Sequence, residues 1–232
     1  MKLKDYLIKF FSAVILAGIA GQIFISCESS EGEPAVLGTE FFGHTSGKWL
    51  IYDVDSTVYD DFLGEVFHYK YQVLEINSEF FTDSEGEESM RLERFWRMTD
   101  EDEWIDKNTW RAKISGSRAF RTEENITYLK LTFPLKLNQK WNGNAFNNKP
   151  SQEYVVSHIY EPYHNGYLQF DSTVRVLQKD FVTLIGEEYQ YEVFAWQVGM
   201  VKKKFVDLSK EVDGTIIRGV DYSYTLMDFG FD

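Results

Sequence analysis

Three residues of the kinds that bind metal ions lie close together in this sequence: His158, Glu161 and His164, each three positions from the next. On a helix, that spacing would bring the three side chains to one face. Pro162 and the Asn165-Gly166 turn argue against a helix here, and on a strand Glu161 would point away from both histidines. We therefore predict a polar strand edge with no metal.

The residue types needed for catalysis are present, but they do not form a known catalytic pattern. No serine stands in a Gly-x-Ser-x-Gly turn, and Cys27 is the only cysteine. No Gly-rich loop is placed to hold a phosphate, so we expect no cofactor. The abundant carboxylates could supply a glycosidase-type pair, whose separation in space the sequence does not give. We predict a protein without catalytic residues, with a carbohydrate-active hydrolase as an alternative.

Aromatic residues are abundant, with 6 Trp, 14 Tyr and 19 Phe in 232 residues. Such side chains fill a core, or they line a concave site on which sugar rings and apolar ligands stack. Core packing is the simpler interpretation. The residues that we expect in a core or around an apolar ligand are Trp49, Tyr69, Leu131 and Trp141.

Chemistry of another kind is indicated at Cys27. A lysine-rich start leads into an apolar run over residues 10–24, and the run ends at Phe24-Ile25-Ser26-Cys27. This layout is typical of a secretory signal, and the run is short for a membrane span. The four residues resemble the lipobox of bacterial lipoproteins, although Leu is more usual than Phe24. The resemblance implies removal of residues 1–26 by signal peptidase II and lipid on Cys27; an uncleaved anchor helix is the alternative.

The net charge of the chain limits the partners that it can bind. The chain has net charge −13, and residues 1–26 carry three lysines and one aspartate, so the mature part carries −13 − 2 = −15. Such an acidic surface repels phosphate backbones and anionic headgroups. We expect no nucleic acid as a partner, membrane contact through the lipid, and an envelope protein or a glycan as the remaining candidates. The run Lys202-Lys203-Lys204 is interpreted as one solvent-exposed strand segment.

Residues 27–38 are polar and acidic with Gly and Pro, which is typical of a flexible tether. An acidic stretch behind a lipidated cysteine resembles the signal that carries some Bacteroidota lipoproteins to the outer face of the outer membrane. A plain solvated linker explains the stretch equally well. We expect a lipid-anchored protein of the cell envelope, at the outer membrane, and leave open whether it faces the periplasm or the outside.

From residue 39 onward, apolar and polar residues alternate with period two, as in strands with one wet face. Phe67, Tyr69, Tyr71 and Val73 give the clearest case, and residues 90–98 and 129–135 give two more. We predict about ten antiparallel strands over 39–232 in an all-β meander or curved barrel-like sheet, with a β-sandwich as the alternative. Turns are predicted at Asp83-Ser84-Glu85-Gly86, Asn142-Gly143-Asn144, Asn165-Gly166 and Asp213-Gly214. Residues 100–113 could hold a short helix.

Two passages suggest an internal duplication. Asp55-Ser56-Thr57-Val58 and Asp171-Ser172-Thr173-Val174 each follow a tryptophan, Trp49 or Trp141. The two halves would be residues 39–120 and 121–232. One continuous sheet is the simpler interpretation.

Two resemblances extend this reading. Gly47-Lys48-Trp49 resembles the Gly-x-Trp that opens the first strand of lipocalins, which implies a barrel plugged by the Trp and a carrier of an apolar ligand as an alternative function. Over most of the mature chain, segments such as Phe133-Pro134-Leu135 and Gly199-Met200-Val201 resemble uncharacterised Bacteroidota lipoproteins. This second resemblance implies location and fold style without an activity. The prediction is a lipid-anchored envelope lipoprotein with a non-catalytic binding or assembly role.

Overall fold

A computed structural model describes residues 37–231 of the chain. The predicted signal segment, Cys27 and the tether up to residue 36 lie outside the described residues. From Leu37 onward the chain forms one compact unit. Within the described range, no helix is long and apolar enough to cross a membrane.

The described chain is almost entirely β-structure, which confirms the all-β prediction. One short 3-10 helix precedes twelve strands, and every strand pairs with its neighbours in antiparallel fashion. The elements are η1 (Thr39–Phe42), β1 (Lys48–Asp60), β2 (Glu65–Thr82), β3 (Glu88–Arg97), β4 (Ile105–Ser115), β5 (Arg118–Glu123), β6 (Ile126–Thr132), β7 (Lys140–Asn142), β8 (Glu153–His164), β9 (Gln169–Val182), β10 (Gly186–Ala195), β11 (Gly199–Lys210) and β12 (Ile216–Phe231).

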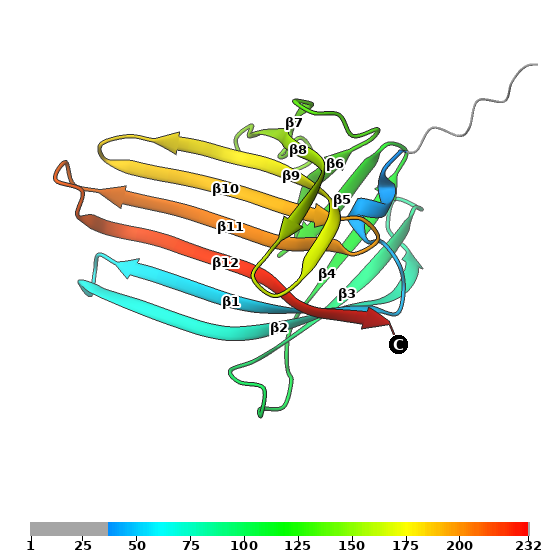
Figure 1. Cartoon of the computed structure of the whole chain (residues 1–232), viewed down its shortest axis with the longest axis horizontal. Helices are drawn as coiled ribbons and strands as arrows, with labels where there is room; N and C mark the ends of the chain where they lie inside the picture. The colour runs from blue at the N-terminus through cyan, green and yellow to red at the C-terminus, as the bar shows by residue number, and fades with distance from the viewer. Residues whose placement is uncertain (1–36, 232) are drawn as a thin grey trace, which may run out of the picture. The chain divides into compact units, whose positions relative to one another are not determined.

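All twelve strands belong to one sheet, so the sandwich alternative does not hold. The strand order is β6-β5-β4-β3-β2-β1-β12-β11-β10-β9-β8-β7, which joins the first and last strands in the middle of the sheet. The sheet curves until its two edges approach, and the Leu129 N–H of β6 donates to the Gly143 carbonyl beside β7 at 2.9 Å. The result is a nearly closed, barrel-like sheet (Figure 1).

Local sequence explains the hairpins, and each predicted turn lies between strands. In the β2–β3 turn, the Asp83 carboxylate accepts the backbone N–H groups of Glu85 and Glu87 at 2.9 and 3.1 Å. This is the short-range bonding that makes Asp a turn residue. Gly214 occupies the β11–β12 turn with a φ of 91°, a conformation that favours glycine.

The helix suggested for residues 100–113 is wrong. Ile105–Ser115 forms β4, and the register pairs Leu92 of β3 with Trp110. Trp110, Ala112 and Ile114 recur with period two, and the first of them suits a strand because aromatic side chains pack well on a pleated surface. Pairing with β3 and β5 on both sides then fixes this segment as part of the sheet.

The two similar Asp-Ser-Thr-Val passages occupy different places in the sheet. Trp49 and Asp55 lie on the same strand, β1, whereas Trp141 lies on β7 and Asp171 lies on β9. The boundary suggested at 120/121 falls inside β5, while the interruption in the strand order falls between β6 and β7.

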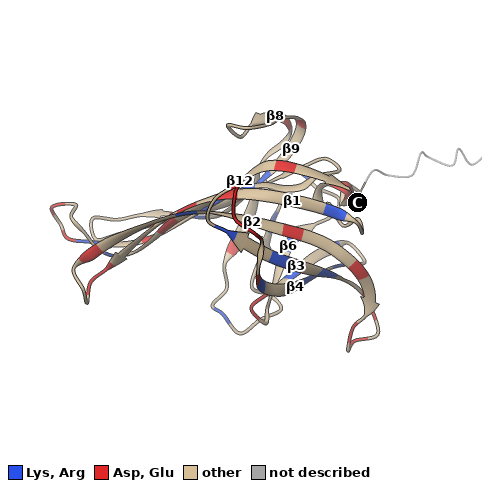
Figure 2. Cartoon of the chain, turned by 90° about the horizontal axis from the view of Figure 1, so that it is seen from below, with Lys and Arg blue, Asp and Glu red and all other residues tan. Residues whose placement is uncertain are grey.

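The hydrophobic core fills the curved part of the sheet. Leu50, Tyr52 and Val54 of β1 face it, as do Leu131 of β6 and Val176 of β9. The 3-10 helix η1 adds the buried rings of Phe41 and Phe42 at the end of the sheet where β10 turns into β11. Beyond the core, six long strands (β2, β1, β12, β11, β10 and β9) continue as an extended part of the sheet (Figures 1 and 2).

Candidate functional site

Several charged side chains point into the curved sheet at positions where period two calls for apolar residues. On β2, the face that carries Tyr71 and Val73 continues to Glu75, which is 2% exposed. On β3, Arg94 shares the parity of the buried residues Met90 and Leu92. Burying a charge is costly unless it is paired, so these residues require partners inside the sheet.

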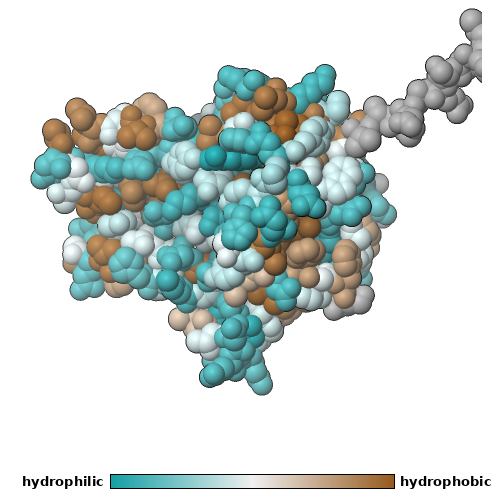
Figure 3. All heavy atoms as spheres, in the orientation of Figure 1, coloured by the Kyte–Doolittle hydropathy of each residue, from teal (hydrophilic) through white to brown (hydrophobic). Residues whose placement is uncertain are grey.

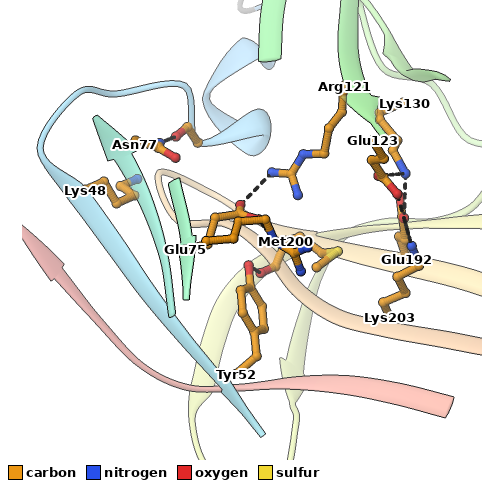
Figure 4. Close-up of polar contacts among 12 residues, drawn as sticks. Lys48, Tyr52, Glu75, Asn77, Arg121, Glu123, Lys130, Glu192, Met200 and Lys203 are labelled. Atoms are coloured by element: carbon orange, nitrogen blue, oxygen red, sulfur yellow. Dashed lines mark hydrogen bonds and ion pairs between the residues drawn. The ribbon is translucent and has the colours of Figure 1, made fainter. Parts of the chain in front are cut away.

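The first partner group consists of Glu75 and two arginines. One Glu75 carboxylate oxygen lies 3.0 Å from Arg121 Nη2 (Figure 4). The other lies 3.3 Å from Arg94 Nε. The Arg94 guanidinium also stacks on the Trp110 ring, 3.5 Å from its centroid, and donates to Asn108 Oδ1 at 3.1 Å. Three strands, β2, β3 and β5, hold one carboxylate between two guanidinium groups.

The second partner group contains two carboxylates and two lysines. Lys130 Nζ lies 2.8 Å from both Glu123 and Glu192, and Lys203 Nζ lies 3.6 and 3.7 Å from the same two residues (Figure 4). Lys130 and Lys203 counteract the effect of burial and lower the pKa of both Glu123 and Glu192. Both carboxylates are therefore held ionised, and β5, β6, β10 and β11 are cross-linked through the interior.

A cavity of about 370 Å³ opens beside these two groups. One wall comes from β3, β4, β5 and β6, and the opposite wall comes from β11 and β12. Its size is that of a small-ligand cleft. The side chains that line it are Arg94, Lys107, Asn108, Trp110, Arg121, Glu123, Glu124, Ile126, Tyr128, Lys149, Lys203, Tyr222 and Tyr224.

The lining of this cavity is basic, although the chain is acidic. Its cations are Arg94, Lys107, Arg121, Lys149 and Lys203, and its carboxylates are Glu123 and Glu124. With the ion-pair partners directly behind the lining, Lys130, Glu75 and Glu192, the balance is 6 − 4 = +2 in a chain of net charge −13. The buried Nε of Arg94 lies within ion-pair distance of Glu75 but makes no hydrogen bond within the described chain.

Aromatic rings and fixed polar groups complete the walls. Tyr222 lies between Phe205, stacked at 5.0 Å, and Tyr224, edge-on at 6.0 Å. On the opposite wall the Trp110 Nε1–H donates to the Glu124 carboxylate at 3.0 Å, and the Lys149 ammonium donates to the Tyr128 hydroxyl at 2.8 Å. These contacts hold the rings and the polar groups in place without a ligand.

The four residues predicted as core or ligand lining do not form one site. Leu131 is buried in the core, and Trp141 packs against the core with its Nε1–H donating to the Leu129 carbonyl at 2.9 Å. Tyr69 is 46% exposed on the extended part of the sheet. Trp49 lies on the opposite face of β1 from Leu50, over Gly230, and does not plug the barrel end as the lipocalin resemblance implies.

Near Gly43, the described side chains leave little free space inside the sheet. The space between Leu50, Tyr52, Glu75 and Arg121 amounts to about 10 Å³, no more than a water molecule needs. A wider hollow of about 600 Å³ lies beside Thr39 and is open to solvent.

The histidine cluster does not converge on one point. His158 contacts Ser157, His164 accepts the N–H of Gly166, and the Glu161 carbonyl accepts a hydrogen bond from Thr173. Among the described residues, carboxylates do converge at Asp83, Glu85 and Glu87. Lys113 Nζ lies 2.5 to 3.1 Å from all three, so an ammonium group already occupies the point where these carboxylates converge.

Sequence reasoning missed most of the cavity, although one signal was present. Lys202-Lys203-Lys204 was interpreted as a wholly exposed segment, yet alternation turns Lys203 inward beside Glu192 while Lys204 pairs with Asp221 on the other face. Lys130, between Leu129 and Leu131, is also buried. Charged residues at inward positions of otherwise apolar strands were the signal that could have found this network.

Comparisons with known proteins give little to identify this chain. No family model and no curated protein matches it. Its structure is similar to that of a chain described as a "putative lipoprotein" from Parabacteroides distasonis, with 12% identity, a TM-score of 0.43, and coverage of 82% of this chain and 98% of that chain. This degree of similarity determines neither fold nor function. The fold and the cavity themselves define an all-β protein with a basic, aromatic-lined cleft.

Proposed function

We propose that this protein is a lipid-anchored cell-envelope protein that binds an acidic glycan, without catalysing a reaction on it, in the cavity between β3–β6 and β11–β12. The observation that supports this proposal is the excess of positive charge in an aromatic-lined cavity of an acidic chain. The net charge of the chain is negative, so the positive charge of the cavity comes from the side chains that line it.

The polar groups of the cavity suit a saccharide. Aromatic faces such as those of Trp110 and Tyr222 can stack on a sugar ring, and Asn108 and Glu124 can bond its hydroxyl groups. A carboxylate or sulfate on the sugar would receive charge-assisted hydrogen bonds from Lys107 and Lys149 at the rim. An apolar ligand would offer no acceptor to these ammonium groups or to the other polar groups of the lining, which disfavours the lipocalin-like carrier.

The ionisation of the interior carboxylates favours binding over hydrolysis. A glycosidase needs one carboxyl group that stays protonated to donate to the leaving oxygen. The pKa values of Glu123 and Glu192 are both lowered by Lys130 and Lys203, and so neither can serve as that acid near neutral pH.

Binding is tested with an array of carboxylated and sulfated glycans printed beside their neutral counterparts, followed by calorimetry on the best acidic ligand. We expect binding to the acidic forms, with neutral counterparts at least tenfold weaker. Lys149→Glu should weaken binding about tenfold, equivalent to about 1.4 kcal/mol. Lys136→Glu, an equally exposed lysine outside the cavity, is the matched control and should bind like the parent.

Two results would contradict this proposal. One is equal affinity for neutral and acidic glycans, and the other is an array on which no acidic glycan binds. Trp110→Ala gives a second check: its loss of binding should exceed that of Trp104→Ala, because only Trp110 lines the cavity.

The lipid anchor is tested by the intact mass of protein extracted from membranes. A mature chain that begins at Cys27 and carries acyl groups supports the anchor, and Cys27→Ala should abolish the modification. An unmodified full-length mass would mean that residues 10–24 remain as an uncleaved segment, contrary to the proposal.

A further inference from the structure

Three hairpin ends lie side by side at the far end of the long strands. They are the β1–β2, β11–β12 and β9–β10 turns, and their strands are consecutive in the sheet order (Figure 1). The Lys210 N–H donates to the Ile185 carbonyl at 2.9 Å, and Arg218 lies 3.8 Å from Asp61, so each turn contacts the next strand pair. Six strands spaced about 4.8 Å apart give a row roughly 25 Å wide.

Each hairpin end presents apolar side chains to solvent. Phe62 is 93% exposed, Leu184 is 75% exposed and Val212 is 72% exposed. Further exposed apolar residues beside them are Leu63, Val66, Phe181, Val182, Ile185 and Ile217. Figure 3 shows apolar atoms at this end of the extended sheet. Turns normally carry polar residues, and apolar groups gathered in one place indicate an interaction surface.

The charges around these apolar residues are mostly negative (Figure 2). Within residues 59–66, 180–187 and 209–218 there are seven acids and two bases, which gives 2 − 7 = −5. Both bases are already paired inside the surface, Lys210 with Glu187 and Arg218 with Asp61. The excess negative charge is therefore available to a partner that brings cations.

The opposite end of the sheet is where the described chain begins. η1 packs beside the turn between β10 and β11, with the Gln197 N–H donating to the Glu40 carbonyl at 3.1 Å. That turn lies at the other end of β10 and β11 from the β9–β10 and β11–β12 turns. The apolar ends thus point away from the place where the chain enters the domain.

We propose that these three hairpin ends form a docking surface for a protein partner that presents an apolar patch bordered by Lys or Arg side chains. The apolar contacts provide the burial, and the acidic rim selects a basic partner through complementary charge. A second copy of this chain would place like charges together, and an anionic membrane would be repelled in the same way.

The test uses a random peptide library displayed on phage and selected against the full chain in detergent. We expect the recovered peptides to combine aromatic or aliphatic residues with Lys or Arg. Their affinity should fall with rising salt, because the rim is exposed. It should also fall at least tenfold for the triple variant Phe62→Ser, Leu184→Ser and Val212→Ser.

A matched triple variant controls for a general loss of apolar surface. Met98→Ser, Ile105→Ser and Leu137→Ser replace apolar residues elsewhere that are each more than half exposed, and this variant should bind the peptides like the parent. Because all six positions are exposed, both variants should fold, which circular dichroism verifies.

Five results would overturn the proposal. The selection could yield no peptides, or neutral or acidic peptides, or peptides that bind both triple variants equally. Alternatively, the parent could self-associate in sedimentation, or bind vesicles of phosphatidylethanolamine and phosphatidylglycerol, through contacts that the hairpin-end variant loses. These last outcomes would assign the surface to a second copy or to lipid.

Discussion

At the scale of the residue, two Lys–Glu pairs have the same geometry and different surroundings. Lys130–Glu192 and Lys140–Glu153 both have N–O distances of 2.8 Å. The carboxylate side chain of Glu192 is 1% exposed and that of Glu153 is 63% exposed. Burial removes the solvent that would screen an uncompensated charge, so the two glutamates should differ in their effect on stability.

We predict that Glu192→Gln lowers the free energy of unfolding by about 3–5 kcal/mol, because it leaves two buried ammonium groups with one carboxylate. Glu153→Gln, the matched control, should lose less than about 1 kcal/mol. Urea unfolding followed by tryptophan fluorescence measures both. Equal losses of unfolding free energy in the two variants would show that burial does not increase the contribution of Glu192 to stability.

A second residue should make stability depend on pH. His44 packs between Phe42 and Phe80, and burial, together with the positive charge of Arg121, lowers its pKa from 6.5 to about 4. As the pH falls from about 6.5 to 4, the unfolded chain binds a proton at His44 while the folded chain does not. This difference favours unfolding, so the contribution to stability is lost as the pH falls through that interval.

Between pH 6.5 and 4, we expect His44 to lower the free energy of unfolding of the parent by an amount on the order of 1–2 kcal/mol. We predict that His44→Gln removes this pH-dependent loss. The measurement is urea unfolding of parent and variant at several pH values in that interval. His158→Gln, at an exposed position, should leave the parent profile unchanged. Identical profiles for His44→Gln and the parent would exclude His44 as the cause.

At the scale of the element, the pairing of β11 with β12 depends on a glycine. Gly219 has a φ of 129°, and a Cβ built there would lie 2.1 Å from the Asp207 carbonyl oxygen of β11. Gly214, in the turn that joins the same strands, has a φ of 91° and open space around the Cβ position. A residue with a Cβ would be strained by the positive φ at either position, and only at position 219 would it also clash with the neighbouring strand.

We predict that Gly214→Ala costs about 1–2 kcal/mol from the left-handed conformation alone. Gly219→Ala should cost at least about 1 kcal/mol more, because β11 must shift to make room. Thermal unfolding compares the two variants. Equal stability of the two variants would contradict the prediction, because it would mean that β12 accommodates the methyl group at position 219 without a shift of β11.

At the scale of the whole molecule, the sheet has a strong junction and a weak one. β1 and β12 pair along their length, from Lys48 with Phe231 to Tyr59 with Gly219. Across the β6–β7 seam, one backbone hydrogen bond is described, from the Leu129 N–H to the Gly143 carbonyl, and the other bonds come from the side chains of Gln139, Trp141, Asn147 and Lys149. Few backbone bonds at one seam predict that local opening begins there.

We predict that Trp141→Phe, which removes one bond of about 1 kcal/mol, speeds hydrogen exchange of the Leu129 amide about fivefold. Amides between β1 and β12 should keep their rates. Trp104→Phe serves as the control, since Trp104 lies outside the seam and stacks on Arg97. Uniform acceleration throughout the sheet would mean that the seam opens only with the whole fold.

The sequence by itself determined the class of fold and the places where the chain turns. Period-two alternation and the Asp-, Asn- and Gly-rich turns act over a few residues, so the strands near Phe67 and Leu131 and the turn at Asp213-Gly214 followed from local physics. The same local rules left the segment around Trp110 open to a helix, because pairing with β3 decides its conformation.

Only the tertiary structure decided what the strands bring together. Pairing of β1 with β12 joins residues that are far apart in the chain, and curvature of the sheet places Arg94 and Trp110 opposite Lys203 and Tyr222. The burial of Lys130 beside Glu192, and the row formed by Phe62 and its counterparts, depend on the same long-range pairing. Sequence spacing carries no information on such distances, because they are set by the register and closure of the whole sheet.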